Sequence, residues 1–277
     1  MNHNISNFAQ TAIELTLPCK DNGDNFVISD RIDKISSILE QSQYKILGKN
    51  NLSYVYRHNE YKPERSTILI SNHVDSLYKK YFTRISEDKI YGTFDNSACN
   101  GVVVELMKQG VLPPQALIAF TGDEEEDSIG VDQTIEILKE KMIFNNLELV
   151  ISLDLTEESF KKRCFTVENF FVRSHNEQSS LKFSKKREIR GFLESILGTD
   201  VKFINDAEPD ESWQYDEHNL NCFTLCLPCL PVRGDMHDDR GVAVKIESFE
   251  RYAKALQEIV VATAKRLANT KNCAECI

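Results

Sequence analysis

The sequence predicts a single α/β domain of three layers, in which helices flank a mixed, mostly parallel central sheet. Short apolar runs with the residue types of buried strands alternate along the chain with stretches of helical periodicity. The chain has 277 residues, of which 41% are hydrophobic, and it contains no repeat, low-complexity tract or Gly/Ser linker. It can therefore fill one large core.

Strands are expected where short runs are rich in Ile, Val, Leu or Phe. These runs are Leu52–His58, Ser66–Ser71, Ala116–Thr121, Leu149–Leu153, Arg163–Val167, Val201–Ile204 and Cys222–Leu227. Helices are expected where apolar residues recur every three to four positions. These stretches are Asp30–Glu40, Ser97–Gln109, Val131–Lys141, Lys186–Ile196 and Ile246–Leu267. Gly110 is the expected stop of the second helix.

Charge and composition exclude two classes of partner. The 43 acidic and 33 basic residues give a net charge of -10, which repels nucleic acid and anionic lipid surfaces. The N-terminus lacks a basic start followed by a long apolar run, and no segment has the roughly 20 apolar residues that cross a bilayer. We therefore expect neither nucleic acid nor membrane as a partner, and a cytoplasmic location.

The 8 cysteines are expected to be free thiols, because a cytoplasmic compartment is reducing. Two CxxC pairs leave an alternative open. Cys226 with Cys229 and Cys273 with Cys276 could together form a four-thiolate structural zinc site.

Acidic residues and histidines gather where the expected strands end. In α/β sheets, functional groups collect at the points where strands end and loops begin. Two strands run directly into such residues. Further acidic residues and a histidine occur before a helix, in an acidic turn and after the last strand-like run. The candidates are His73, Asp75, Asp95, Glu124, Glu125, Asp154 and His237.

Five of these side chains suit a pair of divalent cations. Such a pair needs imidazole and carboxylate ligands, with one carboxylate able to bridge the two ions. Carboxylates packed after an apolar strand would also repel one another unless cations neutralise them. The candidate ligands are His73, Asp95, Glu125, Asp154 and His237.

Two further carboxylates have candidate catalytic roles. A metal-bound imidazole generally needs a carboxylate on its other ring nitrogen, and Asp75 lies two residues from His73, on the same side of an extended backbone. Hydrolysis also needs a group that takes a proton from the attacking water. Glu124, beside a candidate ligand, is the expected general base.

Five fragments occur in one order between residues 66 and 260: NHVD, GTFDNSACNG, FTGDEEEDSIG, SLDLT and MHDDRG. In content, order and spacing they resemble the co-catalytic di-zinc exopeptidases of the zinc-peptidase-like fold, the MH clan of metallopeptidases. The bacterial and vacuolar zinc aminopeptidases are the most similar branch. The resemblance implies a hydrolase that removes the N-terminal residue from peptides or small aminoacyl substrates, through a water bridging two cations and a glutamate general base.

The resemblance also implies a role for each ligand. His73 and Asp154 would bind one metal, and Glu125 and His237 would bind the other. Asp95 would bridge both. Zinc is the implied metal, and cobalt or manganese would also tolerate these ligands.

The choice among three consecutive glutamates rests on a glycine. The family's acidic pair is followed a few residues later by a glycine, which Gly130 matches. This makes Glu124 the base and Glu125 the ligand. A shift by one position, with Glu125 as base and Glu126 as ligand, is the alternative.

Larger relatives carry an inserted lid or dimerisation domain that this chain has no room for. Only 21 residues separate His73 from Asp95, and the stretch from Asp154 to His237 lacks room for a full extra domain. Residues 1–268 are therefore expected to form one catalytic domain without an insertion, and residues 269–277 a C-terminal tail.

Substrate recognition is less well defined by the sequence. Asp210 and Glu211 lie where aminopeptidase relatives place substrate-pocket residues, and either carboxylate could hold a free amino group. Three other functions remain open: an N-acyl amino acid deacylase or carboxypeptidase with the same metals, a noncatalytic binding protein on a peptidase scaffold, and a glutaminyl-cyclase-like transferase with one metal.

Each candidate also has an explanation without function. Asp95 could cap a helix, Asp154 could form a turn, and the acidic run could be a solvated turn. The remaining histidines have no supporting pattern and are expected on the surface or in loops. They are His3, His58, His175 and His218.

Overall fold

Eight strands form a central sheet in the computed structural model, which describes residues 5–18, 20–21, 26–27, 29–157, 165–171, 186–204 and 207–274. The order across the sheet is β11 (Val201–Ile204), β10 (Phe165–Phe171), β12 (Cys222–Pro228), β9 (Leu147–Thr156), β5 (Thr67–His73), β8 (Ala116–Thr121), β4 (Ser53–His58) and β3 (Tyr44–Lys49). Four of the neighbouring pairs run parallel: β11 with β10, β12 with β9, β9 with β5 and β5 with β8. The other neighbouring pairs are antiparallel.

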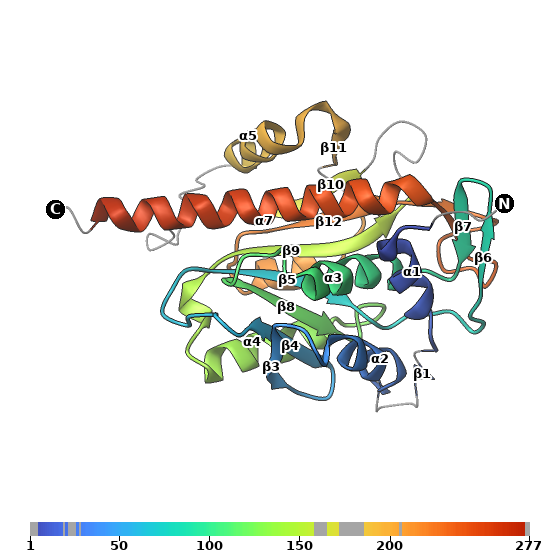
Figure 1. Cartoon of the computed structure of the whole chain (residues 1–277), viewed down its shortest axis with the longest axis horizontal. Coiled ribbons are helices and arrows are strands. Elements are labelled where there is room, and N and C mark those ends of the chain that lie inside the picture. Colours follow the sequence, from blue (N-terminus) through green and yellow to red (C-terminus); the bar gives the residue numbers. More distant parts are fainter. Residues whose placement is uncertain are drawn as a thin grey trace.

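Helices cover both faces of this sheet and complete three layers (Figure 1). On one side, α3 (Ser97–Gln109) and α7 (Ile246–Ala274) contact the central strands, and α1 (Asn7–Glu14), α2 (Ser29–Leu39) and α5 (Lys186–Leu197) pack on those two helices. On the other side lie α4 (Ile129–Glu140) and α6 (Glu211–Glu217). The predicted fold class, an α/β domain with a mostly parallel sheet between helices, is confirmed.

A second, antiparallel sheet lies beside the central one. It contains β13 (Leu230–Pro231), β14 (Val242–Lys245), β7 (Lys89–Gly92) and β6 (Thr83–Ser86), in that order. The short segment between His73 and Asp95 thus forms the β6–β7 hairpin. The smallest elements are the pair β1 (Lys20–Asp21) and β2 (Phe26–Val27) and the 3-10 turns η1 (Phe144–Asn146) and η2 (Gly198–Asp200).

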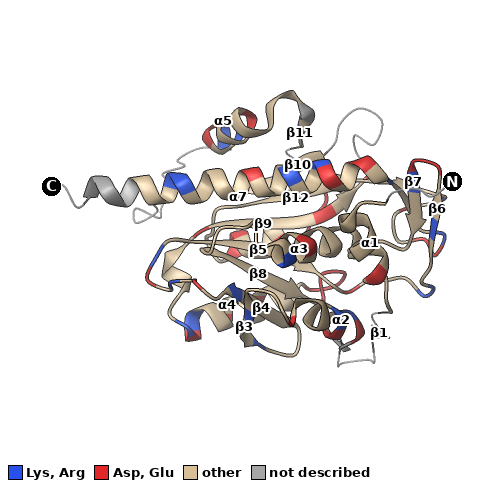
Figure 2. Cartoon of the chain, viewed as in Figure 1, with Lys and Arg blue, Asp and Glu red and all other residues tan. Residues whose placement is uncertain are grey.

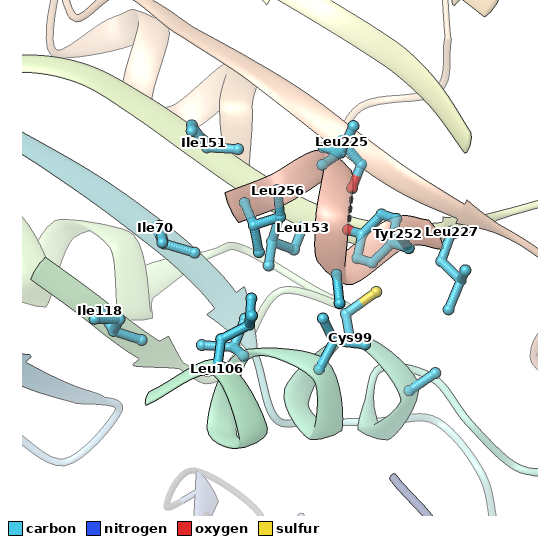
Figure 3. Packing of buried hydrophobic residues seen from close by; sticks show 14 of the residues in the cluster. Ile70, Cys99, Leu106, Ile118, Ile151, Leu153, Leu225, Leu227, Tyr252 and Leu256 are labelled. Carbon is cyan, nitrogen blue, oxygen red and sulfur yellow. Dashed lines mark hydrogen bonds between the residues drawn. The ribbon is translucent and has the colours of Figure 1, made fainter. Parts of the chain in front are cut away.

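The main core lies between the sheet and the helices α3 and α7 (Figure 3). Ile70, Ile118 and Ile151 project from three adjacent strands and are fully buried. Tyr252 of α7 belongs to the same buried cluster, and its hydroxyl donates to the Leu225 carbonyl oxygen at 2.5 Å. Burial of each such aliphatic side chain contributes about 1.5–3 kcal/mol, which fixes the strands whose ends build the site.

Within the described residues, the structure confirms each predicted strand and helix, with shifts at the ends; residues 163 and 164 of the strand expected at Arg163–Val167 lie outside the described residues. Gly110 ends α3 in the left-handed conformation, as expected. The sequence did not predict α1, α6, β3 or the small sheets. The last helix, α7, continues to Ala274. Residues 269–274, which were expected to belong to a C-terminal tail, are therefore helical.

Charged residues of both signs are spread along α7 and the outer loops (Figure 2). Among the residues that the structure describes, no helix combines the length and the apolar character that a membrane span requires.

Candidate metal centre

The ends of three parallel strands bring the first candidates together. β5 ends at His73, β8 leads into the acidic turn, and β9 carries Asp154 near its end. His73 pairs in register with Thr121 of β8, and Asn72 pairs with Leu153 of β9. Because parallel strands end at the same edge of a sheet, their terminal side chains meet there.

One ring nitrogen of His73 faces two carboxylates. Its Nε2 atom lies 3.4 Å from Asp95 Oδ1 and 3.5 Å from Asp154 Oδ1. The His73 and Asp95 side chains are only 2% and 3% exposed, whereas that of Asp154 is 21% exposed. These three residues offer ligand atoms within 4.8 Å of one another, close enough for one cation.

Asp95 also faces a second group of ligands with its other oxygen. Its Oδ2 atom lies 3.3 Å from His237 Nε2, and Glu125 Oε2 lies at the same distance from that nitrogen. Asp95, Glu125 and His237 form a second group of ligand atoms within 4.8 Å. The two oxygens of Asp95 are thus directed to two adjacent groups, the arrangement that a bridging carboxylate requires.

Asp75 and Glu124 lie on the other side of the His73 ring. The Nδ1 atom of His73 is 3.5 Å from Asp75 Oδ1 and 3.8 Å from Glu124 Oε2. The second oxygen of Asp75 accepts a hydrogen bond from the Glu125 backbone N–H at 3.2 Å. Asp75 therefore contacts the imidazole and also holds the turn that carries the two glutamates.

Two asparagines of the α3 start fix the backbone around the site. Asn96 Nδ2 donates to the Leu153 carbonyl at 2.7 Å and to Asn72 Oδ1 at 2.9 Å. Asn100 Nδ2 donates to the His73 carbonyl at 2.9 Å. Neither asparagine was predicted as a site residue from the sequence, although their spacing of four places both on one side of the helix start.

The loop of His237 is held by the segment after β5. The hydroxyl of Tyr78 donates to the Met236 carbonyl, and the Lys79 backbone N–H donates to Asp239 Oδ1 at 2.7 Å. The His237 side chain is 41% exposed, in contrast to His73. This candidate ligand therefore lies on a loop at the surface of the protein.

Gly130 packs tightly against the acidic turn. A Cβ atom there would lie 2.4 Å from the Gly122 carbonyl oxygen and 2.7 Å from that of Leu52. Its backbone N–H also donates to the Gly122 carbonyl at 3.2 Å. Only glycine permits this approach, which sets the position of Glu124 and Glu125 relative to α4.

Burial and like charge raise the pKa values of the carboxylates. For Glu125, burial and then the neighbouring Asp95 raise the pKa to about 8. For Asp154, burial and then Asp95 raise the pKa to about 6. Burial is also the main cause that raises the pKa of Glu124 well above its usual range. A group of carboxylates that resists ionisation in this way is stabilised by positive charge.

For the two imidazoles, the neighbouring carboxylates favour the charged form. Burial lowers the pKa of His73, but Glu124 and the other facing carboxylates outweigh burial and raise it well above its usual value. The hydrogen bond to Asp95 raises the pKa of His237 to about 9. Burial raises the pKa of Asp95, but the two histidines outweigh burial and lower it.

Several buried polar atoms of this site have no hydrogen-bond partner, and their chemistry indicates whether a cation fits. Within the described residues, both ring nitrogens of His73, Asp75 Oδ1, Asp95 Oδ1 and Glu125 Oε1 are buried without a hydrogen-bond partner. Such atoms are costly unless something satisfies them. Nitrogen and carboxylate oxygen are the donors that zinc and related divalent cations take. The donor set therefore fits a pair of cations.

The two substrate candidates occupy different surroundings. Asp210 caps α6: its Oδ1 accepts from the Ser212 N–H at 2.7 Å, and its Oδ2 accepts from Asn169 Nδ2 at 3.1 Å. Glu211 is 1% exposed and accepts hydrogen bonds from buried hydroxyl groups. The expectation that Glu211 binds substrate is therefore corrected, because its side chain points into the protein.

Several alternative explanations do not fit the structure. Asn96 rather than Asp95 occupies the N-cap position of α3, and its side chain makes no capping hydrogen bond. Glu126 is exposed and belongs to none of the ligand groups formed by the described residues. Asp154 lies within β9 rather than in a turn.

Neither His58 nor His218 belongs to a ligand group formed by the described residues. His58 is buried in β4 and contacts Gln43, so its expected surface or loop position is wrong, whereas His218 pairs with Asp132. Cys226 and Cys229 are buried free thiols. His3, His175 and Cys276 lie outside the described residues, as does the side chain of Cys273, so the four-thiolate alternative stays a prediction.

Comparison with models of protein families and with curated protein sequences finds no match. Solved structures, in contrast, share the fold. Aminopeptidase PepT from Bacillus cereus ATCC 10987 has a TM-score of 0.64 at 9% identity, over 94% of this chain and 99% of that chain. Aminopeptidase APDkam598 from the archaeon Desulfurococcus kamchatkensis has a TM-score of 0.66 at 9% identity, over 91% and 94% of the two chains.

A third similar structure is BSAP, a zinc aminopeptidase from Bacillus subtilis, with a TM-score of 0.50 at 14% identity. It is covered over 48% of its length, against 75% of this chain. Identities this low establish a shared fold, and the activity has to be argued from the site.

Proposed function

We propose that this protein is a metal-dependent aminopeptidase that removes the N-terminal residue from peptides or small aminoacyl compounds. The observation that carries the proposal is the position of Asp95, whose two oxygens face His73 and His237 at 3.4 and 3.3 Å. Two adjacent ligand groups that share one carboxylate are what a pair of catalytic cations requires. Aminopeptidases among the solved structures of this fold support the same choice.

The proposed ligands divide into two sets that share the bridging Asp95. His73 and Asp154 would hold one cation, and Glu125 with His237 the other. Zinc is proposed first, because a zinc aminopeptidase shares the fold, and cobalt or manganese suits the same donors. The unit that acts would be residues 1–268 as one catalytic domain.

Bound cations would supply Lewis acidity, polarising the scissile carbonyl and lowering the pKa of the attacking water. Glu124 would then take the proton from that water and deliver it to the departing amine. Burial, and then the neighbouring carboxylates, raise the pKa of Glu124 well above its usual range, which suits a carboxylate that must return a proton as well as accept one.

Two carboxylates have supporting roles in the proposal. Asp75 would hold the His73 ring with its second nitrogen directed to the cation. Asp210 is the candidate for binding the substrate's amino group, since it is only half-buried, unlike Glu211.

Elemental analysis paired with a substrate screen tests this proposal. We expect two cations per chain and hydrolysis of aminoacyl chromogenic substrates, with activity lost when the amino group is acylated. Hydrolysis of N-acyl substrates instead would indicate the deacylase or carboxypeptidase alternative. One cation per chain would favour the transferase alternative, and metal binding without turnover on either substrate class would favour a binding protein.

A further inference from the structure

A buried layer of hydroxyl groups lies directly beneath the candidate ligands. Ser71 precedes His73 by two residues on β5, and Ser152 precedes Asp154 by two on β9, so each pair shares one face of the sheet. Ser71 and Ser152 are opposite each other in the sheet. Thr121, the last residue of β8, is opposite His73.

The carboxylate of Glu211 joins these hydroxyls. Ser71 Oγ donates to Glu211 Oε2 at 2.9 Å, and Ser152 Oγ donates to the same oxygen at 3.3 Å. Thr121 Oγ1 donates to the other oxygen. The hydroxyl of Tyr215 donates to Ser71 Oγ at 2.9 Å, which leaves the Ser71 proton for the carboxylate. One side chain of α6 thus connects three neighbouring strands.

The residues directly below this polar layer are apolar. The next residues inward on the same face are Leu69, Ala119 and Val150, all fully buried and apolar. A carboxylate is costly to bury beside other carboxylates, and burial raises the pKa of Glu211 to about 7. Packing alone would be served better by an apolar side chain.

We propose that Glu211 is a positioning residue for the cation pair. Its three hydrogen bonds tie together β5, β8 and β9, the strands that carry His73, the acidic turn and Asp154. The carboxylate thereby holds the ligands at the separation that the cations need. This role rests on the cation pair of the proposed function, and it concerns residues that substrate does not reach.

Zinc affinity of the metal-free protein tests this role, measured by competition with a chromogenic chelator. Glu211→Gln keeps the side-chain shape but replaces an acceptor of three hydrogen bonds by an amide that must also donate. We expect its zinc affinity to fall roughly 10–100-fold, the usual loss when a group that supports metal ligands is changed. At saturating zinc, kcat should fall while KM changes little.

Glu148→Gln is the matched control. Glu148 is also a buried carboxylate of β9, 7% exposed and bonded to Ser66 Oγ at 3.2 Å, but it lies at the opposite end of the strand from Asp154. We expect its zinc affinity to stay within about twofold of the parent, because no candidate ligand is near it. An equal loss in both variants would overturn the positional role.

A second variant covers the case in which Glu211→Gln fails to fold. It replaces the whole network by apolar residues of similar size, which leaves no unpaired polar group: Glu211→Met, Ser71→Ala, Thr121→Val, Ser152→Ala and Tyr215→Phe. Weakened zinc binding by this folded variant is the expected result. Zinc affinity equal to that of the parent would overturn the proposal.

These outcomes separate the two proposals. Equal zinc affinity in the parent and in both Glu211 variants would contradict the role of Glu211 and leave the peptidase proposal standing. A parent chain that binds two zinc ions but cleaves no aminoacyl substrate would contradict the peptidase proposal alone.

Discussion

The two histidines of the candidate centre are held by different parts of the molecule. His73 ends a central parallel strand and is 2% exposed, whereas His237 lies in the loop between β13 and β14 and is 41% exposed. Asp95 contacts both, from the junction between the small sheet and α3. The strand side is thus built into the core, while the loop side is added at the surface.

This difference indicates how the two sides should respond to change. Removal of a strand-side residue should weaken folding as well as cation binding. Its polar neighbours are buried, so water cannot replace the partner that they lose. A residue of the loop side should affect cation binding almost alone. Substitutions on the two sides should therefore differ in their effect on stability.

Glu124→Gln should cause the largest loss of activity and little else. The amide cannot take a proton from water, so we expect kcat to fall about 10²–10⁴-fold while metal content stays unchanged. Steady-state kinetics and elemental analysis on the same sample measure both effects. Turnover equal to that of the parent would exclude Glu124 as the base.

His73→Ala and His237→Ala should separate folding from cation binding. Both should lower metal content. In the metal-free protein, His73→Ala leaves buried carboxylates without their cationic partner, and we expect a loss of about 3–5 kcal/mol in the free energy of unfolding.

His237→Ala should leave the stability of the metal-free protein close to that of the parent, since its side chain is partly exposed. Urea denaturation in the presence of a chelator compares the two variants. If both lost the same stability, the division into a core side and a surface side would be wrong.

Asp75→Asn should have an intermediate effect. The amide keeps the size of the side chain but removes the charge that faces His73 Nδ1, and it changes the bond with the Glu125 N–H. We expect zinc affinity or turnover to fall roughly 10–100-fold. Chelator competition measures this, with Asp132→Asn, a surface partner of His218, as the control.

The pH dependence should be the smallest effect, and its sign follows from the raised pKa values. In the metal-free protein, Asp154 and Glu125 titrate at about 6 and about 8. The two histidines, whose pKa values are also raised, must lose a proton as well, so zinc affinity should rise as pH rises from about 6 to about 9, with protons released on binding. Calorimetry in buffers of different ionisation enthalpy counts the protons.

Stability of the metal-free protein should change with pH in the opposite direction. The folded state of these two carboxyls binds more protons than the unfolded state between the ordinary values near 4 and the raised values. The metal-free protein should therefore lose stability as pH rises through this window. A zinc-loaded protein should lack this slope, and an identical slope in both forms would argue against cation binding by Asp154 and Glu125.

The sequence determined the order of the main elements and the identity of the candidate ligands. Strands such as Ala116–Thr121 and Val201–Ile204 were predicted with their observed bounds, because apolar runs and periodicity are local signals. The strand-end positions of His73, Glu125 and Asp154 were also local signals. Their convergence follows from the rule that parallel strands end at one edge.

Only the tertiary structure decided which residues support those candidate ligands and which groups Glu211 contacts. Asn96, Asn100 and Glu211 act on strands far away in the sequence, and short elements such as α6 and β6 depend on packing rather than on their own propensity. A sequence records which side chains are present. Which donor meets which buried acceptor depends on distances that exist only after the strands have paired.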